Sequence, residues 1–283
     1  MFSAPPTIGF DTSALNWLKD DVARRLYGRF HVLLFGMNAE EIVATPSVKA
    51  ERREVLLTRL EGLLCSGHCL WPPHMILESL ISAHFKYPMQ FSWQRVSARS
   101  MMYEQGIIRR VFTEEDSSQQ LEHQNAVQEK FEQIWAGIRP ELDAIRSNPA
   151  TKWEPRSFQD VLPVIRADGG GILWGLGRTI YKAVTKADVD EPEIKAFMEK
   201  CPPFRAFAYA LCLSWYDRGI RDPKIGPAFG AGRNDMMMSV YLPYCKRFIT
   251  ADEKHERCMR EVASVSDINC DVMSYQQFIS SLT

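Results

Sequence analysis

The sequence lacks an excess of charge of either sign. Its 283 residues include 34 lysines and arginines and 35 aspartates and glutamates, which gives a net charge of −1 at pH 7. A polyanion such as RNA is therefore not attracted by the molecule as a whole. If the protein binds nucleic acid, it must do so through a local basic patch or through a metal ion.

Long hydrophobic segments are also missing. No apolar stretch approaches the roughly 18–20 residues needed to span a bilayer, and the opening MFSAPP has no basic, apolar secretory pattern. The seven cysteines are an odd number and are scattered along the chain, which is typical of reduced, buried thiols. We therefore expect a cytoplasmic protein without a membrane segment.

Motifs of several other function classes are incomplete. Cys65, His68, Cys69 and His74 resemble one half of a zinc site, but no second Cys/His pair lies at the spacing of a zinc finger. The glycine-rich segment 169–177 lacks the Gly-Lys-Ser/Thr ending of a P-loop. No local motif of a Ser-His-Asp hydrolase is recognisable. Zinc, NTPase and serine-hydrolase functions are therefore not expected.

Short apolar runs alternate with helical patterns at both ends of the chain. This alternation predicts an α/β fold with a mostly parallel sheet. The predicted strands are 8–10, 31–35, 248–250 and 268–273, with 67–71 as a strand or a turn, and the predicted helices are 12–25, 39–44, 48–64, 75–85, 204–215, 235–244, 252–263 and 274–282.

The middle of the chain has a different pattern. Residues 86–205 contain long polar helical stretches interrupted by prolines, with as many basic as acidic residues. We expect a core built from residues 1–85 and 204–283, and a helical insertion or cap over residues 86–203.

Four acids occupy positions at which such a fold binds ligands. Asp11 and Asp252 each follow a short apolar run, Glu41 comes soon after the second predicted strand, and Asp235 starts a predicted helix. The carboxyl ends of parallel strands meet at one edge of the sheet, where α/β proteins bind ligands. Carboxylates gathered there repel one another unless a cation neutralises them, and oxygen ligands without His or Cys favour Mg²⁺ or Mn²⁺. The acids therefore predict metal-assisted phosphodiester chemistry.

Helix capping is the alternative explanation of these acids. An Asp at a strand–helix junction commonly caps the helix, and for any one of the four this is the better interpretation. Their number and order favour metal binding for the set, and one carboxylate can do both. Because crowded carboxylates repel, Asp11→Asn or Asp252→Asn is expected to leave the melting temperature similar or higher. His255, one turn after Asp252, is expected to face solvent, with a role near the phosphate as the alternative.

Three segments resemble parts of the PIN-domain nucleases. Phe10–Leu15 (FDTSAL) is similar to the first strand, its acid and the hydroxyl residue that follows. Asn234–Met238 (NDMMM) is similar to the helix start that carries the third acid, and Phe248–Asp252 (FITAD) to the fourth strand with its Thr-x-Asp ending. The resemblance covers about residues 7–64 and 204–283. It implies a PIN-like three-layer α/β/α sandwich around a mostly parallel sheet, with an insertion that compact members of the family lack.

The resemblance also implies a function, a metal-dependent endoribonuclease that hydrolyses RNA with Mg²⁺ or Mn²⁺. It assigns catalysis and metal binding to Asp11, Glu41, Asp235 and Asp252, and the supporting hydrogen bonds to Thr12, Thr250 and Asn234. Arg233 and Arg257 lie near these acids in the sequence and are therefore candidates for phosphate binding. Glu41 is the first choice for the second acid, ahead of Glu40 and then Glu78.

Two other functions remain open at this stage. The same acids could serve a DNA or structure-specific nuclease, with single-stranded DNA as substrate. Alternatively, a non-catalytic PIN-like scaffold could bind a protein partner through the insertion. A toxin, RNA-processing or phage-defence role and a homo-oligomeric state are compatible with the sequence, which does not choose among them.

Overall fold

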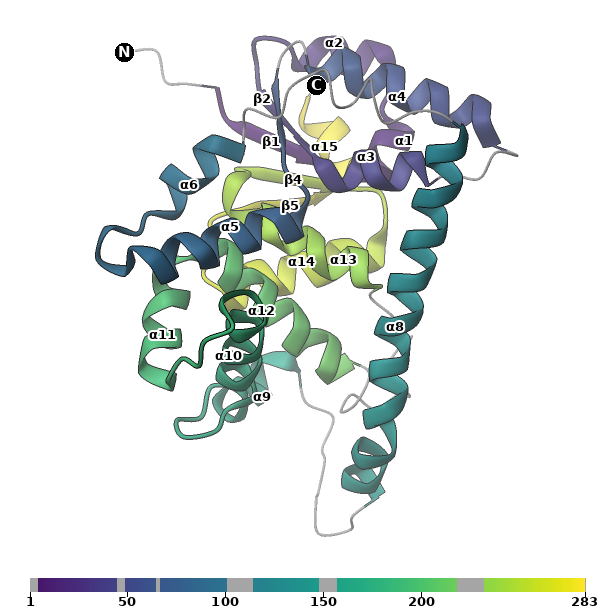
Figure 1. Cartoon of the computed structure of the whole chain (residues 1–283). Helices are drawn as coiled ribbons and strands as arrows, with labels where there is room; N and C mark the ends of the chain where they lie inside the picture. Colours follow the sequence, from purple (N-terminus) through teal and green to yellow (C-terminus); the bar gives the residue numbers. More distant parts are fainter. Residues whose placement is uncertain are drawn as a thin grey trace.

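A five-stranded sheet forms the centre of the molecule and has helices on both faces (Figure 1). The computed structural model describes residues 5–44, 49–64, 67–100, 114–147, 157–217 and 232–282. All strand pairs are parallel, in the order β3-β2-β1-β4-β5. The strands are β1 (Thr7–Phe10), β2 (His31–Phe35), β3 (Gly67–Leu70), β4 (Arg247–Thr250) and β5 (Asp271–Ser274). The predicted α/β fold with a parallel sheet is thus confirmed.

The strands bury side chains on both faces of the sheet. In β2, Val32 and Leu34 join one hydrophobic cluster, whereas Leu33 and Phe35 join another on the opposite face. A strand covered on both sides reads as a continuous apolar run instead of an alternating one. The run at 31–35 therefore predicted β2 with its observed bounds.

The first face of the sheet is covered by short helices from both ends of the chain. They pack on Ile8 and Phe10 of β1 and on Val32 and Leu34 of β2. These helices are α1 (Thr12–Trp17), α2 (Asp20–Leu26), α4 (Ala50–Leu64) and α15 (Tyr275–Ser281).

The second face carries most of the remaining helices, including those of the expected insertion. Phe158, Tyr181 and Phe197 belong to the same buried cluster as Phe35 and Phe248 of the sheet. This part of the insertion therefore contributes to the core, and a role for residues 86–203 as a cap stays a prediction. The helices are α5 (Pro73–Lys86), α9 (Phe158–Ile165), α10 (Ile172–Thr185), α11 (Glu191–Lys200), α12 (Pro202–Trp215), α13 (Arg233–Met238), the 3-10 helix η5 (Ser239–Tyr244) and α14 (Glu253–Val265).

The longest helix lies to one side of these layers. α8 (Glu114–Ser147) has 34 residues and runs from beside α3 (Gly36–Val43) past the level of α12 (Figure 1). On the other side of the picture lie η2 (Pro88–Gln90) and α6 (Trp93–Ser100). Within the described ranges, none of the helices has the length and apolarity to cross a membrane.

Several predicted boundaries were wrong. The helix predicted over 12–25 is split at Leu18, whose backbone is extended and whose side chain is fully buried. The helix predicted over 235–244 changes to η5 after Met238, with Pro243 inside the 3-10 segment. The helix predicted over 39–44 begins earlier, at Gly36, so that Asn38 is the third residue of α3, and its Oδ1 accepts a hydrogen bond from the Phe35 backbone N–H at 3.1 Å.

Gly67 is the position where the sheet tolerates a side chain least. A Cβ there would overlap the carbonyl oxygen of Val32 and lie 2.8 Å from its carbonyl carbon. Because these are backbone atoms of the neighbouring strand, we expect Gly67→Ala to lower the free energy of unfolding by about 1–3 kcal/mol or more. Urea denaturation measures this change.

Gly62→Ala on α4 is the matched control. No atom lies within 4 Å of the Cβ that it would add, and alanine favours helix, so this variant should be as stable as the wild type or more so. Equal stability of the Gly67→Ala variant and the wild type would show that β2 and β3 are not held as closely as described.

Candidate functional site

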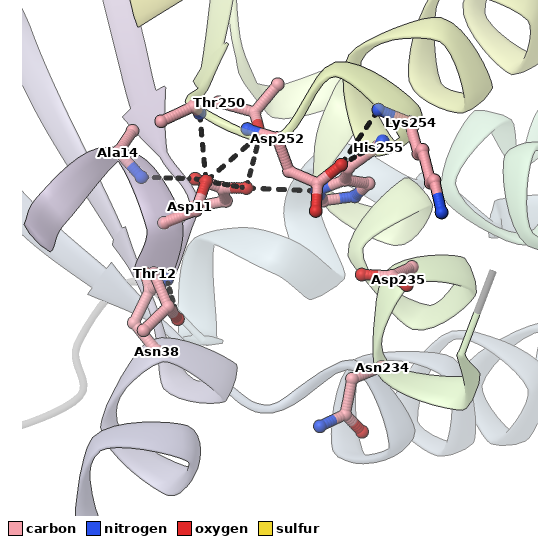
Figure 2. Close-up of polar contacts among 12 residues, drawn as sticks. Asp11, Thr12, Ala14, Asn38, Asn234, Asp235, Thr250, Asp252, Lys254 and His255 are labelled. Carbon is pink, nitrogen blue, oxygen red and sulfur yellow. Dashed lines mark hydrogen bonds and ion pairs between the residues drawn. The ribbon is translucent and has the colours of Figure 1, made fainter. Parts of the chain in front are cut away.

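Asp11 lies at the centre of a hydrogen-bond network at the end of β1. Its buried carboxylate is the N-cap of α1 and accepts the Ala14 N–H at 2.7 Å. It also accepts the Ser13 hydroxyl at 2.8 and 2.9 Å, the Thr250 hydroxyl at 2.6 Å and His255 Nδ1 at 3.0 Å (Figure 2). Both carboxylate oxygens are therefore already engaged by donors.

These hydrogen bonds connect β1 with β4, which are distant in sequence and adjacent in the sheet. The Ala251 N–H donates to Ser13 Oγ at 2.8 Å, and the Asp252 N–H donates to Thr250 Oγ1 at 3.0 Å. From β1 the chain proceeds to β2 and β3 on one side, and later returns to β4 and β5 on the other. Asp11 thus stands at the switch point of the strand order, where α/β proteins form ligand sites.

His255 is part of this network. It was expected to face solvent, and that expectation was wrong: its side chain is 5% exposed and packs edge-on against Phe248. Burial disfavours the charged ring, but the hydrogen bond and charge of Asp11, together with the charges of Asp235 and Glu41, raise the pKa of His255 to about 9. Its buried Nε2 has no hydrogen-bond partner in the described part of the chain.

Asp11 is the anionic partner of this ring. Burial alone would raise the pKa of Asp11, but the hydrogen bond and charge of His255, with the bonds from Thr250 and Ala14, hold it below its usual value. Near neutral pH the two groups therefore form a buried ion pair.

Glu41 is held by a second set of hydrogen bonds. Its carboxylate accepts the hydroxyl of Thr12 and, at 3.1 Å, the Nδ2 of Asn234. Thr12 in turn accepts Asn38 Nδ2 at 3.1 Å. The structure therefore brings Thr12 and Asn234 next to Glu41, and Thr250 next to Asp11. Asn38 was not identified as a site residue, because its sequence context also suits an ordinary helix cap.

Three of the four predicted acids influence one another electrostatically. Burial is the main cause that raises the pKa of Glu41, and the charges of Asp235 and Asp11 raise it further, whereas the bonds from Thr12 and Asn234 lower it. Asp235 comes from the first turn of α13, where its Oδ2 accepts the Gly232 N–H at 2.9 Å. Figure 2 shows Asp235 and Asn234 on the same side of the network, across from Thr12 and Asn38.

Asp252 caps a helix, which was the alternative to metal binding in the sequence analysis. Its Oδ1 accepts the backbone N–H groups of Lys254 at 2.8 Å and His255 at 3.0 Å at the start of α14. The residue is exposed. It lies beside Asp11 and His255 in Figure 2, so capping does not remove it from the site.

The alternative second acids, Glu40 and Glu78, lie on different helices, α3 and α5. Burial and the charge of Glu41 raise the pKa of Glu40 to about 7, although the charge of Arg233 opposes them. Glu78 is an exposed residue of α5. Glu41 is the one of the three that hydrogen-bonds Thr12 and Asn234, so the structure favours it as the second acid.

The two arginines predicted to bind phosphate lie in different surroundings. Arg233 starts α13, and its backbone N–H donates to Gln128 Oε1 of α8 at 3.2 Å. Arg257 lines a surface hollow of about 490 Å³ together with Glu253, Glu256 and Glu261. Acidic side chains offset its charge there, which weakens the case for Arg257 as a phosphate ligand.

A hollow beside Glu41 offers two cations that the sequence analysis missed. It has a volume of about 270 Å³ and lies between α1, α3, α4 and α8. Glu41 and Thr12 line it together with Lys49, Arg52 and Gln124. Arg52 is in the first turn of α4 and Lys49 directly precedes this helix. In the sequence their charges resemble ordinary surface charges, so only the fold reveals their position next to an acid.

The geometry does not by itself identify a metal centre. Among the described residues, no three His, Cys, Asp or Glu side chains are placed so that they could hold a metal ion as they stand. In the zinc-like pattern, His68 instead hydrogen-bonds His31 at 2.9 Å, and Cys65 lies outside the described residues. The predicted Mg²⁺ or Mn²⁺ therefore stays a prediction.

Comparisons of the chain with protein-family models, with curated proteins and with solved structures found no match. The likeness to PIN-domain nucleases rests on the three sequence segments alone. The family, like the metal, stays a prediction.

The Asp11–His255 pair changes the expected effect of removing Asp11. Asp11→Asn would leave a buried imidazolium without its anion, so we expect the free energy of unfolding to fall by about 3–5 kcal/mol instead of staying level. Asp252→Asn is the matched control, because asparagine also caps helices well and this position is exposed. Urea denaturation measures both variants, and equal effects of the two would contradict the ion pair.

The same pair predicts how stability depends on pH. The pKa of His255 is about 9 in the folded protein and near 6.5 when unfolded. The contribution of His255 to the free energy of unfolding is thus fully present below pH 6.5 and lost as the pH rises through 9. Over this window the folded state holds the extra proton, so stability should fall by up to about 1.4 kcal/mol per pH unit.

Urea denaturation at several pH values between 6 and 10 measures this slope. His255→Gln should flatten it, while Asp252→Asn should leave it unchanged. A wild-type curve as flat as that of His255→Gln would contradict the raised pKa.

Proposed function

We propose that this protein is a metal-dependent phosphodiesterase that hydrolyses RNA at the acidic edge formed by the ends of β1, β2 and β4. One observation carries the proposal. Carboxylates from three distant parts of the chain lie close enough that Asp11 and Asp235 raise the pKa of Glu41. Crowding of this kind opposes ionisation, and a divalent cation relieves it because it favours the charged carboxylates.

The donor chemistry suits Mg²⁺ or Mn²⁺, which prefer carboxylate oxygens. Glu41 and Asp235 would hold the ion, with Asp252 at the exposed side of the site. Asp11 is buried and paired with the ring of His255, so it would mainly position Thr250 and His255. Because no three of these groups converge as they stand, binding would require their side chains to turn toward one another. When bound, such an ion lowers the pKa of a water molecule and stabilises negative charge on the phosphate.

The chain's own residues would orient the acids and the substrate. Thr12 and Asn234 hold the Glu41 carboxylate from two sides, which fixes its direction. Lys49 and Arg52 line the hollow next to it and would bind the phosphates of the strand. Glu40, with a pKa of about 7, could exchange a proton near neutral pH.

RNA is proposed as the substrate because of the resemblance to PIN-domain nucleases. A DNA nuclease and a non-catalytic scaffold that binds a partner through residues 86–203 are the alternatives, and the experiment below separates them. A cytoplasmic location and a homo-oligomeric state remain expectations from the sequence.

The test is cleavage of end-labelled single-stranded RNA and DNA in Mn²⁺, in Mg²⁺ and in EDTA. We expect RNA cleavage with either metal and none in EDTA. Asp235→Asn should lower the rate more than about 100-fold, because even residues that only orient a metal ligand cost about 10- to 100-fold when changed. Asp188→Asn is the matched control, since Asp188 is 85% exposed and pairs with Lys182.

Three other outcomes of the cleavage test would contradict the proposal, and each would favour a different alternative. Cleavage of DNA alone would move the assignment to the DNA nuclease. Metal-dependent cleavage that persists in Asp235→Asn would place the active site elsewhere. No cleavage by a folded protein, together with no Mn²⁺ binding in isothermal titration, would favour the non-catalytic scaffold.

A further inference from the structure

A further hollow, separate from those beside Arg257 and Glu41, lies between α5, η2 and α6. This α5–α6 pocket has a volume of about 520 Å³, within the range of small-molecule sites in proteins. Figure 1 shows α5 and α6 extending to the side of the molecule opposite α8. Its lining includes Trp71, Lys86, Tyr87, Gln90, Phe91 and Arg95.

Aromatic rings form part of the wall of the α5–α6 pocket. Phe91 is fixed from behind, because it packs edge-on against His84 and contacts Phe197. Tyr87 is 64% exposed at the rim, and Trp71 is partly buried. Flat rings at different depths give a planar group a surface on which to stack, as nucleic-acid bases do on aromatic side chains.

The charge of the pocket has a single sign. Lys86 and Arg95 line it, and none of the described residues that line it is an aspartate or glutamate. Three serines and Gln90 add hydroxyl and amide groups that can donate hydrogen bonds. This is uncommon in a chain whose charges balance overall, and it favours a ligand with an anionic end.

We propose that the α5–α6 pocket binds a nucleotide, with its base stacked on Tyr87 or Trp71 and its phosphate on Lys86 and Arg95. A stacking surface beside a cationic, donor-rich wall matches the two halves of that ligand. The ligand is either a free mononucleotide or one unit of a single strand, since both present the same base and phosphate. The proposal does not depend on the acidic edge being catalytic.

Isothermal titration in EDTA tests the proposal independently of any metal-dependent cleavage. The probes are AMP, UMP, an eight-nucleotide single-stranded RNA and inorganic phosphate. We expect a mononucleotide or the RNA to bind, and the Lys86→Gln/Arg95→Gln variant to bind it at least about tenfold more weakly. Tyr87→Ala should weaken binding without unfolding the protein, because the ring is mostly exposed.

The Arg24→Gln/Arg25→Gln variant is the control, since it removes the same charge from exposed positions of α2. Saturable binding of a mononucleotide identifies a free nucleotide as the ligand, and binding of the RNA alone identifies a strand. Absence of binding of every nucleotide probe up to millimolar concentration would overturn the proposal. Binding that is equal in the pocket variants and the control variant would overturn it as well, even if RNA cleavage is observed.

Discussion

The carboxylate of Asp11 holds together parts of the chain that no local interaction could join. It accepts donors from α1, from the end of β4 and from α14, and it is buried where β1 and β4 meet. A buried carboxylate is tolerated only when its oxygens are satisfied and its charge is balanced. Thr250, Ser13 and His255 meet those two requirements. The positions of Asp252 and of the first turn of α14 follow from them.

The acidic edge has two separate means of balancing its charge. The part around Asp11 contains its own cation, the ring of His255. In the part around Glu41 and Asp235, the direct contacts of Glu41 are hydroxyl and amide donors, Lys49 and Arg52 line the hollow beside it, and the pKa of Glu41 is raised. The four predicted acids therefore differ in role. Asp11 organises the edge through its hydrogen bonds, whereas Glu41 and Asp235 are the acids whose charge a bound ligand could still balance. A list of acids in sequence order cannot make that distinction.

Local patterns predicted the elements that depend on local burial. The prediction of β2 was correct because its residues after His31 form a continuous apolar run. The acids Asp11 and Asp252 were also placed correctly after their strands. The break at Leu18 was missed, because a buried leucine fits a helix and an extended turn equally well. The burial of His255 was also missed, since it results from the pairing of β1 with β4, and no sequence periodicity contains that information. The same holds for the hollow that joins Glu41 to Lys49 and Arg52.

The position of β1 between β2 and β4 has a consequence for synthesis of the protein in the cell. β1 and β2 follow each other closely along the chain, but the other neighbour of β1 begins at Arg247, well over 200 residues later. At about 5–20 residues per second, one side of β1 stays without its partner strand for roughly 10–50 seconds. During that interval Asp11 has neither Thr250 nor His255, and Glu41 has neither Asp235 nor Asn234. A nascent chain therefore cannot assemble the acidic edge until the residues through His255 have been made.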